Sequence, residues 1–529
     1  MYKAKIIQLL TIILFLGISS SVPPLSAQDL DFTNIPAEVN FSEKIRVWDG
    51  FGVNYVETSQ TFDYDEWPQD YGGFSFLDPK SRDEIVDLIF GDNGLQPDLV
   101  KMFLDPLHLS EEGGTFDHET TTANMRYFVS RGNEISQARG QNLSIITTLY
   151  GPPGFMTLQR NIRGRDLDPD YKDQLADYMV NWIHFLTEQE NLPVEYVSLH
   201  NEGESWLRWP LDGGLADIDA TGHDYNMFWS PELMSDMIIR TRNALDQKGL
   251  SHVGVTPGEA TNWYRFGTWG YSTELVRNRE ALDAMALITS HGFYVGDIER
   301  RRWYGPHSNR GNEELRAIRP ELRAWCTSTA WDVKNDELII DNRVQRRYIV
   351  NAHFILEVHG NIYEANVNGL IPWAFIQTAS QWVRPDPNPG SAIRVYDDGT
   401  WEIRKGYYYY KQLTQAGKRG MHVVNTSSMD SQINVIGFSG EGTEHPDAFV
   451  MANTGRENMT VKFRIVDSSH EQFQAYRTSG NDIYEYTETA LYEEDENNDN
   501  YSDIGLFALD GEYLIYEAPA NSVTTFMGL

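Results

Sequence analysis

The chain has 529 residues, a formal net charge of −34 and 12% aromatic residues. A chain this acidic will not bind nucleic acid through its overall electrostatic field. Its length exceeds that of one ordinary domain and suits a large barrel with one small partner domain. The only cysteine, Cys326, excludes an intrachain disulfide; because it lies in apolar sequence, we expect a packed core residue.

The first residues have the pattern of an export signal. Lys3 and Lys5 precede an apolar run from Ile6 to Ile18, and small residues before Gln28 offer a cleavage site. The run is too short to span a bilayer and has no stop-transfer flank. We therefore expect residues 1–27 to be removed, giving a periplasmic or extracellular chain of net charge −36 with no membrane segment.

Between Trp48 and Leu413, short apolar β-rich runs alternate with longer helical patterns. Eight such units in a row predict an α/β fold, a (β/α)8 TIM barrel, rather than an open sheet. The expected strands are Gly50–Val56, Leu99–Leu104, Leu143–Leu149, Val194–His200, Val253–Thr256, Ala286–His291, Leu322–Thr327 and Gly369–Phe375. The clearest expected helices are Asp83–Phe90, Met125–Arg139, Asp173–Gln189, Pro231–Lys248, Ser272–Ala284 and Arg343–His359.

After Lys411 the pattern changes to short alternating strands without a convincing helix, which is typical of a β-sandwich. The expected strands are Val423–Thr426, Gln432–Phe438, Ala448–Ala452, Thr460–Val466, Phe473–Arg477, Gly511–Glu517 and Ser522–Met527. The strand-like stretch Phe32–Trp48 is expected to join that sandwich. The predicted organisation is residues 1–27 signal, 28–48 N-terminal strand of the sandwich, 49–413 barrel and 414–529 sandwich.

The fourth expected barrel strand ends in His200-Asn201-Glu202. Catalytic groups of such barrels lie at the C-terminal ends of the strands. A carboxyl in a partly dry site there can have a raised pKa and act as a general acid, and Asn201 can bind a substrate hydroxyl. The dipeptide alone is common and would more often be a surface loop, but its position favours function.

Other strand ends carry candidate binding residues. His291 and Tyr294 lie at and just after the end of the sixth strand and suit hydroxyl or carboxylate partners. The eighth strand ends in Ile371-Pro372-Trp373, which can put the indole of Trp373 under a sugar ring. Each could equally be packing at the barrel mouth. The third strand runs into Tyr150–Met156, a Pro- and Gly-rich loop that could wall the site.

Together these residues resemble the clan-A retaining glycoside hydrolases, and most closely glycoside hydrolase family 30. Asp49-Gly50-Phe51-Gly52 is similar to the family's first strand, and Pro152–Met156 to its Pro-Pro-x-Trp-Met loop. Asn201-Glu202 matches the clan's fourth-strand pair, and Ser522–Phe526 is similar to the last strand of its side sandwich. The resemblance covers nearly the whole mature chain and implies cleavage of a β-linked polysaccharide with Glu202 as acid/base.

The sequence departs from this family at the seventh strand. The clan has its nucleophile Glu there, whereas this segment reads Trp325-Cys326-Thr327-Ser328-Thr329 and puts Ser328 at that position. A serine cannot form a glycosyl ester, and no base beside it is evident. Retaining chemistry needs two carboxyls about 5–5.5 Å apart, and the expected positions supply only Glu202.

Three explanations compete. The chain is a disabled variant with Ser328 in place of Glu; or another carboxylate acts, among them Glu259, Asp332 or Asp105; or the protein is a non-catalytic sugar binder. An inverting hydrolase would need a second carboxylate about 6.5–9.5 Å from Glu202, for which Glu259 or Asp332 is better placed than Glu204. We favour the first two, because the acid/base position is intact.

Arginines are concentrated in the expected loops on the catalytic face. Arg is suited to forked recognition of sulfate or carboxylate oxygens, which favours an anionic substrate: a sulfated galactan of the carrageenan or porphyran kind, or a uronate-bearing xylan. The alternative is that they pair with the abundant Asp and Glu. Substrate-binding candidates in these loops are Trp206, Arg208, Arg301, Arg302, Trp303 and Arg384; Arg160, Arg163, Arg165, Arg300 and Arg310 belong to the same set.

No metal or cofactor is required by this chemistry. Residues 495–503 space oxygen ligands at alternate positions, with Asp495, Asn497, Asp499 and Asp503 as side-chain candidates, which resembles part of a Ca²⁺ loop. We favour a solvated acidic hairpin there instead. The sequence is silent on oligomeric state, and the expected partner is a polysaccharide or oligosaccharide.

Overall fold

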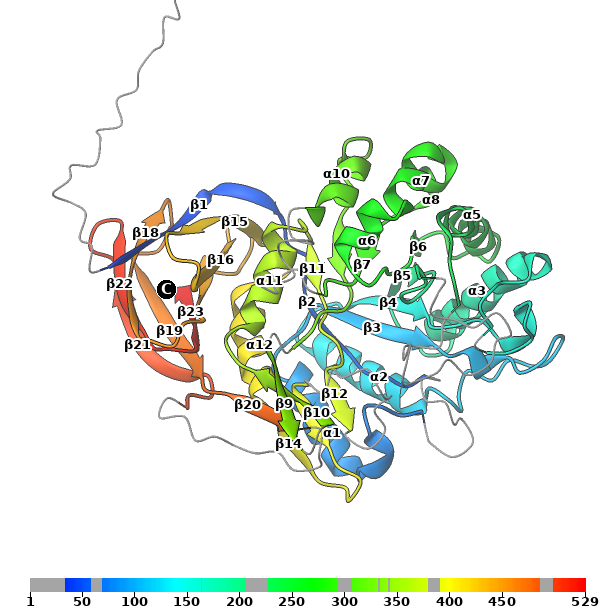
Figure 1. The fold of residues 1–529 in the computed structure, drawn as a ribbon, viewed down its shortest axis with the longest axis horizontal. Coiled ribbons are helices and arrows are strands. Elements are labelled where there is room, and N and C mark those ends of the chain that lie inside the picture. Colours follow the sequence, from blue (N-terminus) through cyan, green and yellow to red (C-terminus); the bar gives the residue numbers. More distant parts are fainter. Residues whose placement is uncertain are drawn as a thin grey trace, which may run out of the picture.

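The computed structural model describes residues 34–58, 69–162, 164–205, 227–293, 307–331, 334–340, 343–378, 391–485 and 498–529. Within them the chain forms a barrel of parallel strands surrounded by helices and, beside it, a curved β domain that contains the C-terminus (Figure 1). The predicted fold class, a TIM barrel with an attached β-sandwich, is confirmed.

The eight barrel strands fall where the sequence predicts them, each the same length or shorter. Spatially they follow the order β6-β5-β4-β3-β2-β11-β8-β7, and the barrel closes where Val255 of β6 forms a bridge to Met285, just before β7. Their residues are almost all buried, because helices cover the outside and side chains fill the inside. The strands are β2 (Gly50–Asn54), β3 (Leu99–Leu104), β4 (Ser144–Leu149), β5 (Val194–Ser198), β6 (Gly254–Thr256), β7 (Ile288–Ser290), β8 (Ala324–Cys326) and β11 (Gly369–Leu370).

Some of the helices around the barrel, α1 and α5 among them, begin at local capping signals. Asp78 accepts hydrogen bonds from Lys80 N and Ser81 N at the start of α1, and Ser230 accepts one from Leu233 N at the start of α5. In both helices a proline follows the cap. The helices are α1 (Pro79–Phe90), α2 (Ala123–Ala138), α3 (Lys172–Glu188), α5 (Pro231–Gln247), α6 (Trp263–Thr268), α7 (Tyr271–Arg277), α8 (Arg279–Ala284), α10 (Arg310–Arg316), α11 (Phe354–Tyr363) and α12 (Lys405–Ala416).

Two predicted helices differ from the structure. Ser272–Ala284 is divided into α7 and α8, because Asn278 leaves the helical conformation and its side chain caps α8 at Ala281 N. Arg343–His359 was wrong in its first half: β10 (Arg343–Val350) is a strand, and only α11 is helical. The apolar spacing was ambiguous, and antiparallel pairing of β10 with β9 (Lys334–Ile340) and β20 (Asp482–Glu485) selects the extended form.

The second domain is one curved sheet in the order β21-β19-β23-β17-β16-β15-β1-β18-β22. As predicted, the N-terminal segment joins it: β1 pairs with both β15 and β18. The seven strands expected after Lys411 are confirmed, while β21 was not predicted. The strands are β1 (Ile35–Val47), β15 (His422–Ser428), β16 (Ile433–Ser439), β17 (Ala448–Asn453), β18 (Met459–Val466), β19 (Gln472–Ser479), β21 (Ser502–Ala508), β22 (Tyr513–Ala518) and β23 (Ser522–Gly528).

The curvature closes this sheet over its own core. Tyr516 on the edge strand β22 lies 5.3 Å from Phe526 on β23 and 5.5 Å from Phe507 on the opposite edge strand β21, measured between ring centroids. The two edges of the sheet therefore face each other across a shared set of aromatic rings, which gives the two-layer packing of a sandwich.

The two domains share a hydrogen-bonded interface. Helix α12 lies between them: Thr525 Oγ1 donates to Gln412 O (2.8 Å), and Tyr410 Oη donates to Gly52 O (2.6 Å). Tyr363 Oη on α11 donates to Val424 O (3.0 Å). The structure also contains two small three-stranded sheets. The first, β20-β10-β9, links the domains through β10 and β20. The second consists of β12 (Ile376–Thr378), β13 (Ile393–Val395) and β14 (Trp401–Ile403).

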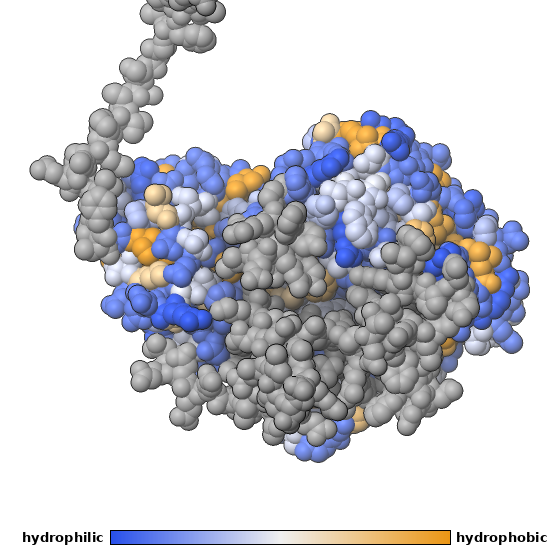
Figure 2. All heavy atoms as spheres, viewed as in Figure 1, coloured by the Kyte–Doolittle hydropathy of each residue, from blue (hydrophilic) through white to orange (hydrophobic). Residues whose placement is uncertain are grey.

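On the face shown in Figure 2 the coloured atoms are mostly hydrophilic, with small separate hydrophobic patches. Within the described ranges no helix has both the length and the apolar composition needed to cross a membrane. Residues 1–33, which include the expected export signal, lie outside the described residues.

Candidate active site

The loop after β5 places Glu202 at the C-terminal end of the barrel. Beyond the strand, Glu202 N donates to Glu259 O (2.6 Å) and Glu259 N donates to His200 O (2.9 Å), so the ends of the fourth and fifth barrel strands are tied together. Gly258 permits this approach, because a Cβ there would lie 2.2 Å from the His200 ring. Glu202 itself adopts a left-handed backbone conformation, with φ at +45°. Such a conformation is uncommon for a residue with a side chain and is found at constrained functional positions.

Glu202 is hydrogen-bonded to His291. The distance between Glu202 Oε1 and His291 Nδ1 is 2.8 Å, and only 4% and 3% of the two side chains are exposed. His291 directly follows β7, and its backbone N donates to Ala260 O (2.9 Å). Two residues that were chosen independently from strand ends therefore lie in direct contact.

The other ring nitrogen of His291 faces a second carboxylate. His291 Nε2 lies 3.0 Å from Oε2 of Glu259, the same oxygen that accepts a hydrogen bond from Lys101 Nζ at 2.5 Å. Thr148 Oγ1 donates to the other oxygen of Glu259 at 2.7 Å. Lys101, Thr148, Glu259 and His291 come from four different strands, so the barrel interior assembles one buried polar chain that ends on Glu202.

Burial and neighbouring charges have opposite effects on the pKa values of Glu259 and His291. Burial alone raises the pKa of Glu259, but the Lys101 ammonium and the hydrogen bond from His291 outweigh it and lower that pKa to about 2. Burial lowers the pKa of His291, but its hydrogen bonds to Glu202 and Glu259 outweigh burial and raise it. Glu259 is therefore ionised at neutral pH, and His291 holds its proton more firmly than a free imidazole.

Neighbouring groups are held in other roles. Glu204 Oε1 accepts hydrogen bonds from Arg265 Nη1 (2.8 Å) and from the backbone and hydroxyl of Thr261. Burial lowers the pKa of His200 to about 4, and its ring stacks on Trp229 at a centroid distance of 5.2 Å. His200 is therefore neutral, and Glu204 acts as a structural anion for the loop.

Ser328 lies at the same end of the barrel, two residues after β8. Its carbonyl accepts a hydrogen bond from Gly292 N (2.7 Å), next to His291, and the carbonyl of Thr327 lies 3.4 Å from Lys101 Nζ. The Ser328 hydroxyl is buried and has no hydrogen-bond partner among the residues that the structure describes. The structure thus brings Ser328 close to the buried hydrogen-bonded side chains that end on Glu202. The catalytic role of Ser328 stays a prediction.

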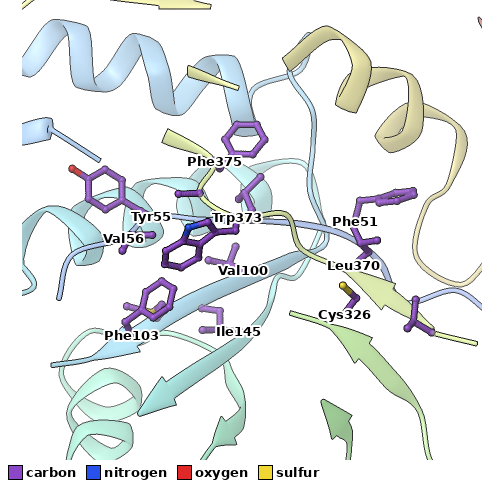
Figure 3. Packing of buried hydrophobic residues seen from close by; sticks show 14 of the residues in the cluster. Phe51, Tyr55, Val56, Val100, Phe103, Ile145, Cys326, Leu370, Trp373 and Phe375 are labelled. Carbon is purple, nitrogen blue, oxygen red and sulfur yellow. The ribbon is translucent and has the colours of Figure 1, made fainter. Parts of the chain in front are cut away.

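Of the remaining candidates, Trp373 is mostly buried among other aromatic side chains. Its ring meets Phe103 edge-on at 5.8 Å and is 6% exposed, and Figure 3 shows it among Val56, Phe103 and Phe375. Asn201 is buried at 1% exposure beside Glu202. Asp105 caps a short helical turn by accepting from Leu107 N (2.7 Å). Glu259 and Asp105 are thus both held by partners inside the described structure.

The anion-binding prediction falls largely outside the described residues. The three described arginines of that set each contact a carboxylate: Arg160 with Asp168 at 2.6 Å, Arg165 with Asp166 at 2.9 Å, and Arg310 with Glu314 at 3.0 Å. The other candidates lie outside the described residues: Tyr294, Trp206, Arg208, Arg301, Arg302, Trp303, Arg384, Arg163, Arg300 and Asp332.

In the possible calcium loop, only residues 498–503 are described. Asp499 Oδ2 accepts from Arg477 Nε (2.6 Å), and Asp503 Oδ1 accepts from Gln474 Nε2 (2.5 Å). Lys405 Nζ donates to the Asp499 carbonyl at 3.1 Å. Protein donors contact these oxygens, and a calcium site at residues 495–503 stays a prediction. Elsewhere in the described ranges, no group of three or more His, Cys, Asp or Glu side chains is arranged to hold a metal ion.

The sequence did not single out Lys101 or Thr148. Lys101 carries a signal, because it is the one charged residue in the otherwise apolar strand Leu99–Leu104 and is fully buried there. A buried lysine requires a charged partner. The sequence offers Glu259 as a substitute nucleophile or as the second carboxylate of an inverting hydrolase; the structure places it, fully buried, in an ion pair.

No family model and no curated protein matches the sequence. Solved structures do match over nearly the whole chain. A GH30 endoxylanase from Clostridium papyrosolvens C71 is 16% identical, with 93% of this chain and 99% of that chain covered and a TM-score of 0.60. The catalytic domain of GH30 xylanase C from Talaromyces cellulolyticus is also 16% identical, with 93% and 100% covered and a TM-score of 0.62.

The endo-β1,6-glucanase BT3312 is similar to the same extent, at 16% identity, 93% and 94% coverage and a TM-score of 0.59. These similarities extend over both domains, and at such low identity they concern the fold. The chain therefore has the same two-domain fold as these GH30 structures, a (β/α)8 barrel with a side β-sandwich.

Proposed function

We propose that the protein is a glycoside hydrolase that cleaves a β-linked polysaccharide at the C-terminal end of the barrel, with Glu202 as acid/base. The observation that carries this proposal is the position of Glu202: at the end of the fourth barrel strand, buried, and hydrogen-bonded to His291. A carboxyl that shares a proton with an imidazole in a nearly dry site can both give and accept that proton. The hydrolase fold of the similar structures agrees with this activity.

The second catalytic group decides the stereochemistry. Among the described carboxylates near Glu202, Glu259 is paired with Lys101 and Glu204 with Arg265. Neither is placed to attack a sugar, which favours Ser328 as the position of a retaining nucleophile over an inverting route through Glu259. In the proposed mechanism, a carboxylate at position 328 forms the glycosyl-enzyme, and Glu202 first protonates the leaving oxygen and then activates water.

The experiment is reducing-sugar release from carrageenans, porphyran, agarose and glucuronoxylan, with the chain as written and with Ser328→Glu. We expect release only from Ser328→Glu, because that change supplies the missing carboxylate. Ser328→Gln is the matched control, since it adds the same volume without the charge and should remain inactive.

Other outcomes would redirect the mechanism. Release by the chain as written would contradict a nucleophile at position 328 and point to another carboxylate, beginning with Asp332. No release by either protein, together with measurable binding of one of these glycans, would favour a carbohydrate-binding barrel without turnover. The serine at position 328 is the observation that favours this second candidate.

We further propose that the substrate is anionic, a sulfated galactan or a uronate-bearing glycan, and that residues 1–27 direct export. The arginines of the strand-end loops support the first proposal, against a mature net charge of −36. We expect affinity for the charged glycan to exceed that for its desulfated or uronate-free counterpart and to fall as salt rises from about 0.05 to 0.5 M. Calorimetric titration of both glycans at equal salt checks this; equal affinities would contradict it.

A further inference from the structure

The two hydrogen bonds of His291 limit where its protons can be. An ionised carboxylate can only accept hydrogen bonds, and a neutral imidazole has one donor and one acceptor nitrogen. Because Glu259 is held as an anion by Lys101 Nζ at 2.5 Å, His291 Nε2 must be the donor across the 3.0 Å contact to Glu259. The tautomer of His291 is therefore set by a lysine on the opposite strand.

The remaining nitrogen shares one proton with Glu202. Either Nδ1 carries it and Glu202 is ionised, or Oε1 carries it and His291 is neutral; the 2.8 Å contact contains one proton in both cases. We propose that this proton rests on His291 Nδ1, that the hydrogen bond stores it for Glu202 to deliver to the leaving oxygen, and that Lys101 and Glu259 position His291 for that task. This inference rests on the proposed function and adds three positioning residues to it.

The proton balance closes over one catalytic cycle. The Nδ1–H bond breaks as the Oε1–H bond forms, which leaves a neutral imidazole still donating to Glu259 through Nε2. The Oε1–H bond then breaks as the leaving oxygen gains its proton. When Glu202 later takes a proton from the attacking water, that proton returns to Nδ1. In the resting state the negative charges of Glu202 and Glu259 are balanced by the positive charges of Lys101 and the protonated His291.

Several charged groups face His291. Glu202 lies on the loop after β5, Glu259 on the loop after β6, and Lys101 within β3; His200 adds a neutral ring behind the same loop. The carboxylates raise the pKa of His291 and Lys101 lowers it, with the carboxylates dominant. The stored proton is therefore present below that raised pKa and is lost as the pH rises through it.

Nitrogen-15 NMR of histidine-labelled protein tests, without any substrate, whether His291 holds the stored proton. The His291 signal is assigned by its loss in His291→Gln. In the wild-type chain we expect both ring nitrogens to be protonated at pH 7, with a titration midpoint above that of a free imidazole. In Glu259→Gln the midpoint should fall by about one pH unit or more, because an opposite charge next to the ring is removed.

Glu204→Gln is the matched control, because Glu204 is also buried in this loop but binds Arg265 rather than His291. It should leave the His291 midpoint unchanged. If Glu259→Gln fails to fold by circular dichroism, Glu202→Gln provides the second test, and the midpoint should fall there too. A singly protonated His291 at pH 7 in the wild-type chain, or an unchanged midpoint in the carboxylate variants, would overturn the proposal.

A pH profile separates this inference from the proposed function. In the protein that hydrolyses glycan, the alkaline limb of kcat/KM should move to lower pH in Glu259→Gln, which loss of packing alone would not cause. If Glu259→Gln hydrolyses glycan and the alkaline limb of its kcat/KM profile does not move, the proton store is overturned and the proposed hydrolase activity stands. A lack of hydrolysis on every glycan would overturn the hydrolase, and the NMR titration would still decide how His291 is protonated.

Discussion

Glu202→Gln should reduce kcat by about 10²- to 10⁴-fold in whichever protein cleaves glycan, the chain as written or Ser328→Glu. The amide keeps the shape of the carboxyl but can neither donate an acidic proton nor activate water. It can still accept the hydrogen bond from His291 Nδ1, so the loop after β5 should keep its structure. Initial rates at saturating substrate measure the effect.

Glu204→Gln is the control for this comparison. It makes the same chemical change two residues away, at a side chain whose oxygen is bound by Arg265 and Thr261. We expect less than a tenfold change in kcat. Equal losses in the two variants, or a Glu202→Gln protein that keeps full activity, would show that Glu202 is not the acid/base.

Lys101→Met should lower the free energy of unfolding by about 3–5 kcal/mol, because it leaves the fully buried Glu259 carboxylate without its cation. Methionine has nearly the length of lysine, so the change removes charge with little loss of volume. Urea unfolding followed by tryptophan fluorescence measures the difference. A loss below about 1 kcal/mol would contradict a large contribution of this ion pair to the free energy of unfolding.

The double variant Lys101→Met/Glu259→Gln should recover part of this loss, because both charges are then absent from the core. The pH dependence has a definite sign. The pKa of Glu259 is lowered to about 2 in the folded chain, below its ordinary value. The pair therefore stabilises the fold above about pH 4.5, and this stabilisation is lost as the pH falls toward about 2. The gap between wild type and Lys101→Met should close over the same range.

Much of the barrel could be predicted from local sequence. Parallel strands that are buried on both faces read as short continuous apolar runs, and all eight were found where those runs occur. The prediction failed at Arg343–Val350, where a helical spacing of apolar residues becomes the strand β10. It pairs with β9, which directly precedes it, and with β20, which lies more than a hundred residues away, so only part of the pairing that selects the strand is local in the sequence.

The site shows the same division. Glu202 and His291 could be predicted because they lie at the ends of expected strands, and Ser328 because the family resemblance puts it at the nucleophile position. In a parallel barrel all such strand ends meet at one mouth. Trp373 was chosen by the same rule, yet its ring packs against Phe103. Position after a strand fixes the end of the barrel at which a residue lies; it does not fix the direction of the side chain.

The sequence by itself therefore determined the class of fold, the joining of the N-terminal strand to the sandwich, and the end of the barrel that carries the candidate chemistry. These follow from periodicity and order along the chain. Only the tertiary structure decided that Glu259 is an ion-paired anion and that Lys101, Glu259, His291 and Glu202 form one buried chain. Such pairing depends on barrel closure, which brings side chains from separate strands within hydrogen-bond distance and removes the water that would otherwise screen their charges.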